Sequence, residues 1–150
     1  MTDSPDLTWM LEEHLLRLVP GTRYAVLLSA DGLLRAHAGS SDRDEAERVA
    51  AGLAGLKGTF RAISGFCHAT YEGWQQTLSE FDEGFIFLVA AGPGAYLGVS
   101  TTKDVDLEGV SSQLQKLVQR LGDVLTTPPR PSAQQGVEDW FAVQGPGSQG

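Results

Sequence analysis

The sequence predicts an α+β fold with three helices and five strands, and three observations support this prediction. Helical and strand periodicities follow one another in the order α-β-β-α-β-β-β-α. Short turn sequences, such as Ala30-Asp31-Gly32 and Gly92-Pro93-Gly94, separate neighbouring strand segments and are typical of hairpins. A long helix in the middle of the chain has one apolar face and one face of small residues.

The first half of the chain begins with a helix and a strand pair. Ser4-Pro5-Asp6 predicts a helix start, and Pro20-Gly21 ends the helix. Its apolar residues recur at helical spacing: Leu7, Met10, Leu11, Leu15 and Leu18. Two strands, residues 24–29 and 33–38, then flank the Asp-Gly turn. Asp42, followed by Glu45 three residues later, resembles a capping box and starts the middle helix.

The middle helix, residues 42–64, is the most informative element. Its predicted core stripe is Ala46, Val49, Ala50, Leu53, Leu56, Phe60 and Ile63. The opposite face carries Ala51, Gly55, Gly58 and Ala62 instead of charged residues. Each glycine in a helix interior costs about 1 kcal/mol relative to alanine, and a closely packed second backbone would offset that cost. We therefore expect this face to meet a partner; the alternative is that the small residues merely face water.

The second half predicts three strands and a helix. Residues 74–81 alternate loosely and are polar, which favours an edge strand, whereas residues 85–91 are continuously apolar and fit a strand covered on both faces. Residues 95–100 form the fifth strand. Asp104 or Asp106 caps the last helix, residues 107–125, whose core stripe is Leu107, Val110, Leu114, Leu117, Val118, Leu121 and Leu125.

The composition divides the chain into a domain, residues 1–125, and a flexible Pro/Gly-rich tail, residues 126–150. Trp140 and Phe141 interrupt the tail; they either dock on a partner, dock on the domain, or are incidental. The formal charge of −8 argues against nucleic-acid binding and against docking on an anionic membrane. The first residues show no basic start followed by an apolar stretch, so we expect no signal peptide. The longest apolar run, residues 85–91, is too short to cross a bilayer as a helix, and we expect a cytoplasmic protein.

Catalytic and cofactor motifs are missing from the sequence. The stretch from Gly52 to Thr59 fails as a P-loop because its lysine precedes the second glycine, and the turn at residues 92–94 lacks a dinucleotide fingerprint. Cys67 beside His68 is at best half of a metal site. We therefore expect no enzymatic activity, no metal and no cofactor.

Three parts of the chain resemble one known family. They are the strand-turn-strand from Tyr24 to Leu34 with its Ser-Ala-Asp-Gly-Leu turn, the long small-residue helix, and the closing Tyr96-Leu97-Gly98-Val99-Ser100. Together with the order of elements over residues 5–125, they are similar to the roadblock, or dynein light chain, family, with its roadblock/profilin-like topology. The pattern resembles the actinobacterial branch of that family, whose members are encoded in conservon gene clusters.

This resemblance implies a five-stranded antiparallel sheet with the long helix on one face and the terminal helices on the other. It also implies a homodimer formed through the long helix and the third strand. The residues of this chain that fall at those places are Ala51, Gly55, Gly58, Ala62, Gln75, Gln76, Thr77 and Leu78.

The resemblance further implies a non-enzymatic regulator or scaffold of a small Ras-like GTPase. Such a protein activates or localises the GTPase in a bacterial signalling complex. A histidine-kinase-like protein is a further partner that the conservon context implies, and partners would recruit the chain to the membrane. We expect Glu47, Arg48 and Arg61 to contact the GTPase from exposed positions at the rim of the helix pair. A small-molecule sensor of the PAS or GAF kind is the alternative function, and an enzyme is the third.

Overall fold

The computed structural model describes residues 5–40 and 42–126. The helices are α1 (Pro5–Leu11), which continues into a π-helical turn (Glu12–Leu16), α2 (Arg43–Ala62), the short 3-10 helices η2 (Ser64–Cys67) and η3 (Tyr71–Gly73), and α3 (Leu107–Thr126). The strands are β1 (Thr22–Ser29), β2 (Leu34–Ala38), β3 (Gln76–Phe81), β4 (Gly84–Ala90) and β5 (Ala95–Thr102). The predicted order of elements is confirmed.

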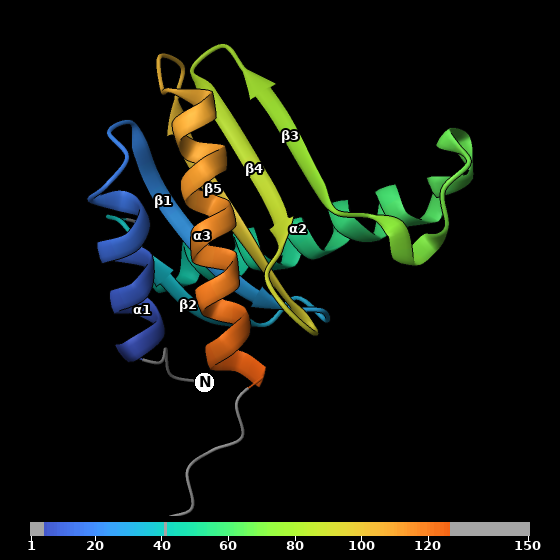
Figure 1. Ribbon diagram of the computed structural model, residues 1–150, viewed down its shortest axis with the longest axis horizontal. Coiled ribbons are helices and arrows are strands. Elements are labelled where there is room, and N and C mark those ends of the chain that lie inside the picture. The colour runs from blue at the N-terminus through green and yellow to red at the C-terminus, as the bar shows by residue number, and fades with distance from the viewer. Residues whose placement is uncertain (1–4, 41, 127–150) are drawn as a thin grey trace, which may run out of the picture.

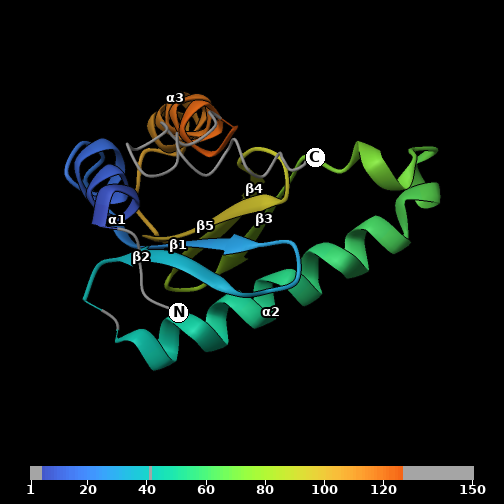
Figure 2. The same cartoon turned by 90° about the horizontal axis from the view of Figure 1, so that it is seen from below.

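The five strands form one antiparallel sheet in the order β2-β1-β5-β4-β3. The last strand therefore pairs with the first at the centre of the sheet, and β2 and β3 lie at its edges (Figure 1). α2 lies on one face, and α1 and α3 lie on the other (Figure 2). This confirms the antiparallel sheet and the two helical layers that the family resemblance implied.

Strand alternation divides the buried residues into two cores. The larger core lies under α1 and α3, where Leu27, Leu97, Val99 and other residues of one sheet face meet helix residues such as Leu11 and Leu117. The smaller core lies under α2, and it contains Val26, Leu28, Leu34, Ala46, Ala50, Leu53 and Leu88. β4 contributes to both cores, as its continuous apolar sequence predicts.

The start of α2 is fixed by the predicted cap. The Asp42 side chain accepts a hydrogen bond from the Glu45 amide at 2.8 Å, which satisfies one of the free N–H groups of the first turn. At the end of α1, the Arg17 amide instead donates to the Glu12 carbonyl five residues earlier, at 3.0 Å. This wider turn ends the first helical segment at Leu16, whereas the sequence predicts a helix that continues up to Pro20-Gly21.

Two strand starts differ from the prediction by two residues. β1 begins at Thr22 because that residue already pairs with Thr101 of β5. β3 begins at Gln76 rather than at residue 74. The Trp74 indole donates to Thr77 Oγ1 at 3.0 Å and its ring lies 5.9 Å from the Tyr96 ring, so Trp74 anchors the entry to the strand.

The predicted core stripe of α2 is correct only in part. Ala46, Ala50 and Leu53 are buried, and Leu53 lies against Gly98 of β5, where a Cβ would come within 2.3 Å of its methyl carbon. Val49, Phe60 and Ile63 are exposed, however, which corrects the prediction. At about 30 Å, a 20-residue helix is longer than the sheet is wide, and the end of α2 extends beyond the β3 edge (Figures 1 and 2). In α3, Leu107 is likewise exposed rather than buried.

Two glycine substitutions test the packing of the sheet. A Cβ at Gly84 would lie 1.9 Å from the backbone oxygen of Thr101, so Gly84→Ala should lower the free energy of unfolding by about 3 kcal/mol. The control is Gly122→Ala in α3, where a Cβ meets no atom of the described residues within 4 Å outside the helix's own backbone; it should raise stability by about 1 kcal/mol. Urea denaturation measures both variants. Equal stability of the two variants would contradict the close approach of β4 and β5.

Candidate functional site

The small-residue face of α2 is open in the single chain. Ala51, Gly55 and Ala62 are exposed, and Gly58 is partly buried. A Cβ built on Gly52, Gly55 or Gly58 would meet no atom of the described residues within 4 Å, outside the helix's own backbone. The three glycines together cost the helix about 3 kcal/mol relative to alanine, and no tertiary contact at their Cβ positions requires them. This face is therefore accessible to a closely packed partner.

The third strand presents a free edge. Within the described sheet β3 pairs with β4 alone, so its other edge has no strand partner. Of the predicted interface residues, Gln76, Thr77 and Leu78 lie on β3 and Gln75 immediately precedes it. Leu78 is 50% exposed although it is a large apolar residue. An unpaired edge of this kind is a template for pairing with a second strand.

A groove of about 480 Å³ joins this edge to the end of α2. Its lining includes Gln75, Gln76, Thr77 and Leu78 on one side and Phe60, Ile63 and Phe66 on the other. Phe66 is 93% exposed. Sequence reasoning missed these three apolar residues as surface candidates, because Phe60 and Ile63 continue the helical spacing of the core stripe. Only the overhang of α2 beyond the sheet shows that they are exposed.

The sheet face under α2 is also covered unevenly. α2 packs on β1 and β2 and reaches β5 through Leu53. On β3 and β4, Phe81 remains exposed and Ile86 is partly buried; both line a smaller hollow of about 210 Å³ with Arg23 and Ser100. The exposed end of α2, the β3 edge and this hollow together place unburied apolar surface along one side of the molecule.

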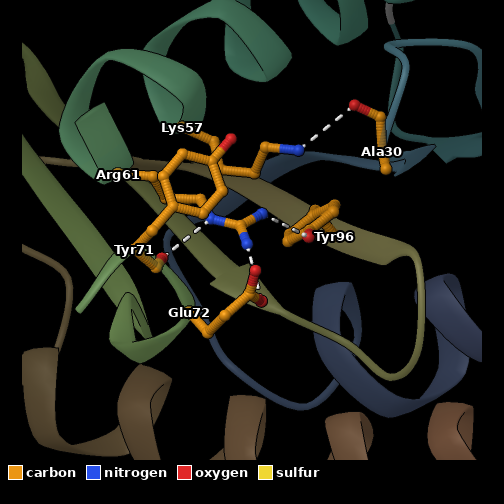
Figure 3. Close-up of polar contacts among 6 residues, drawn as sticks. All are labelled: Ala30, Lys57, Arg61, Tyr71, Glu72 and Tyr96. Atoms are coloured by element: carbon orange, nitrogen blue, oxygen red, sulfur yellow. Dashed lines mark hydrogen bonds and ion pairs between the residues drawn. The ribbon is translucent and has the colours of Figure 1, made fainter.

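A polar cluster around Tyr96 of β5 holds the second half of α2 (Figure 3). Lys57 is only 6% exposed; its ammonium group donates to the Ala30 carbonyl at 3.1 Å and lies 4.1 Å from the centre of the Tyr96 ring. One turn further along α2, Arg61 NH1 lies 3.4 Å from the Tyr96 hydroxyl oxygen. A buried lysine thus occupies a position where the periodicity would place an apolar side chain, and a cation–π contact compensates part of its lost hydration.

Arg61 does not lie at an exposed rim, which corrects the expectation from the sequence. Its side chain is only 15% exposed and it contacts Tyr71, Glu72 and Tyr96. Glu47 and Arg48 are exposed as expected, and Glu47 forms an ion pair with Arg43 at 3.2 Å. Fourteen residues separate Glu47 from Arg61, which corresponds to about 20 Å along the helix axis. The structure therefore does not bring the three predicted contact residues together within one chain.

A second groove, of about 460 Å³, lies between β3 and α3. Gln76, Gln115 and Gln119 line it together with Leu78 and Val118. In the described part of the chain, no group of three or more His, Cys, Asp or Glu side chains is arranged to hold a metal ion. None of the described helices is both long and apolar enough to span a membrane. The tail with Trp140 and Phe141 lies outside the described residues.

Comparisons with known proteins agree with this architecture. The Roadblock/LC7 domain family matches residues 7–101. One solved Roadblock/LC7 domain from Streptomyces avermitilis is 29% identical with a TM-score of 0.74, and the match covers 84% of this chain and all of that one. A second structure from that organism is 33% identical with a TM-score of 0.60, covering 78% and 99% of the two chains.

More distant structures share the fold. Myxococcus xanthus MglB is 13% identical with a TM-score of 0.71, and the match covers 85% of this chain and 100% of MglB. No significant match is found among curated proteins. The matched residues span most of the described domain, from the first helix to the end of the fifth strand. The chain therefore belongs to the Roadblock/LC7 family.

Proposed function

We propose that this chain is a homodimeric, non-enzymatic regulator or scaffold of a small Ras-like GTPase. The observation that carries the proposal is the two-sided α2, whose inner face packs on the sheet while its small-residue face remains open beside the free β3 edge. Family membership supports the partner class, since the resemblance described above implies GTPase binding. The chain itself has no P-loop, so we expect it neither to bind nor to hydrolyse nucleotide alone.

The dimer follows from the distribution of unburied surface. The helix glycines leave room for a closely packed backbone, the β3 edge is free to pair with a strand, and the sheet face under β3 and β4 is incompletely covered. A second copy related by a two-fold axis supplies the same helix and the same edge, so one symmetric contact can satisfy all three needs. Two paired β3 strands would then join the two sheets into one.

The first test of the dimer is Gly55→Leu. A leucine at this position would push a packed second backbone away, so we expect the variant to be a monomer of 16.0 kDa under conditions in which the parent has twice that mass. Leucine is the better helix former by about 0.8 kcal/mol, so the isolated domain should not be weakened by loss of helix propensity. Light scattering at micromolar concentration measures the mass.

The matched control is Ser112→Leu, which adds a leucine to an exposed position of α3 on the other face of the sheet. This variant should remain dimeric. Equal dimerisation of Gly55→Leu and the parent would show that the small-residue face is not the interface, and a monomeric parent would remove the dimer altogether.

The second test concerns the GTPase. Glu47 and Arg48 are exposed charges near the start of α2, next to the small-residue face, and charged groups at such a rim influence partner choice and association rate. Reversing both, in Glu47→Lys with Arg48→Glu, keeps the net charge and should weaken GTPase binding at least tenfold while the dimer persists. The loss of the exposed Arg43–Glu47 pair should cost the fold less than about 1 kcal/mol.

Interferometry against a Ras-like GTPase encoded next to this chain, loaded with GDP and then with a GTP analogue, measures the binding. The control exchanges charges on α3 in Glu108→Lys with Lys116→Glu and should bind as the parent does. If neither nucleotide state binds the parent, the GTPase proposal fails. A PAS- or GAF-like sensor then becomes the leading candidate, with the glutamine-lined groove between β3 and α3 as the place to look for a ligand.

A further inference from the structure

The segment between α2 and β3, residues 64–73, extends beyond the sheet, and we call it the arm (Figures 1 and 2). It contains η2 and η3, and every residue of it except Ser64 is exposed. Such a segment gains little from apolar burial, so its position depends on a small number of specific contacts. The arm carries Phe66 and borders the 480 Å³ groove whose lining also includes Leu78. The position of the arm therefore also determines the shape of this groove.

Arg61 supplies several of these contacts at once. Its Nε atom donates to the Tyr71 carbonyl at 3.1 Å, its NH2 atom lies 2.9 Å from a carboxylate oxygen of Glu72, and its guanidinium carbon lies 4.2 Å from the centre of the Tyr71 ring. These contacts hold η3. The remaining nitrogen, NH1, reaches the Tyr96 hydroxyl at 3.4 Å. One side chain thus connects the arm to the sheet (Figure 3).

Tyr96 is a firm anchor for this connection. It lies on β5, which pairs with both β1 and β4 in the interior of the sheet. Its ring contacts the Lys57 ammonium on one side and lies 5.9 Å from the Trp74 ring, and Trp74 leads into β3. Arg61 lies just before the arm and Trp74 lies directly after it, and both contact the same tyrosine.

We propose that Arg61 is a positioning residue for the dimer: by tying the arm to Tyr96 it presets the groove between the arm and β3 for a second copy of this chain. This inference rests on the dimer proposed above and assigns Arg61 a role other than contact with the GTPase. A loose arm would have to be ordered when the dimer forms, and that ordering weakens association. A fixed arm holds Phe66 in one arrangement relative to Phe60, Ile63 and Leu78, which line the same groove.

Only an arginine fits this position. Its three acceptors lie in different directions, and the planar guanidinium group serves them with separate nitrogens while its face covers the Tyr71 ring. A lysine would place one ammonium group there and could not span the arm and Tyr96 together. The ion pair itself is minor, because the Glu72 side chain is 83% exposed. The bonds to the Tyr71 carbonyl and to Tyr96 are the important ones.

The test measures the dimer dissociation constant of the full chain by sedimentation velocity over a dilution series. Arg61→Ala and Arg61→Lys should each raise it at least tenfold, and Glu72→Gln should change it less than threefold. The control is Arg120→Ala, an exposed arginine on α3, which should leave the constant unchanged. Hydrogen exchange at a dilution where all variants are monomeric should be faster for the arm amides in both Arg61 variants and unchanged in β5.

A thermal melt of each variant separates positioning from folding. If Arg61→Ala lowers the melting temperature strongly, its dissociation constant no longer separates positioning from folding. The Arg61→Lys variant and the hydrogen-exchange data then test the inference, because the lysine keeps a cation and an aliphatic stem at the site. A parent-like dissociation constant for Arg61→Lys overturns the inference, since charge alone would then suffice. Unchanged hydrogen exchange of the arm amides in the Arg61 variants also overturns the inference. A monomeric parent refutes the dimer, whereas a dimeric parent with an unchanged dissociation constant in Arg61→Ala refutes only the role of Arg61.

Discussion

The packing of α2 across part of one sheet face is the constraint on which the rest of this structure depends. The helix is about 30 Å long, whereas five strands at about 4.8 Å spacing make a sheet only about 20 Å wide. Leu53 can approach the sheet closely because Gly98 of β5 has no side chain. The first half of the helix is thereby fixed on β1, β2 and β5, and its end must extend beyond the β3 edge.

This overhang explains why apolar surface is unevenly distributed. The face under α1 and α3 has a large continuous core, and the face under α2 has a small one. Phe60 and Ile63 follow the same apolar spacing as the buried residues of α2 but are exposed, as is Phe66 of the arm. Next to them lies the free edge of β3. The exposed surface of the single chain therefore resembles that of one subunit of an assembly more than that of a self-contained domain.

The polar cluster at Tyr96 lies where α2 leaves the sheet, and there is a physical reason for this position. Where α2 leaves the sheet, an apolar side chain would be covered on one side only. A long cationic side chain can bury its aliphatic stem and still satisfy its charged end at the border. Lys57 does so with the Ala30 carbonyl and the Tyr96 ring, and Arg61 does so with the arm. The cluster thus stabilises the transition from the buried half of α2 to its exposed half.

The sequence by itself determined the order and kinds of the elements, because each is encoded locally. Asp42 and Glu45 start α2, the apolar run of β4 marks a strand buried on both faces, and the spacing from Val110 to Leu121 defines the buried stripe of α3. The small-residue face was also visible, since its glycines are local too.

Tertiary structure alone decided which apolar residues are buried. Helical periodicity specifies which side of α2 faces the sheet but not how far the sheet extends beneath it. Phe60 and Ile63 were therefore misassigned to the core; Val49 is also exposed, although it lies in the half of α2 that covers the sheet. Arg61 was misassigned to the surface because its acceptors lie on η3 and β5, ten or more residues away in the chain.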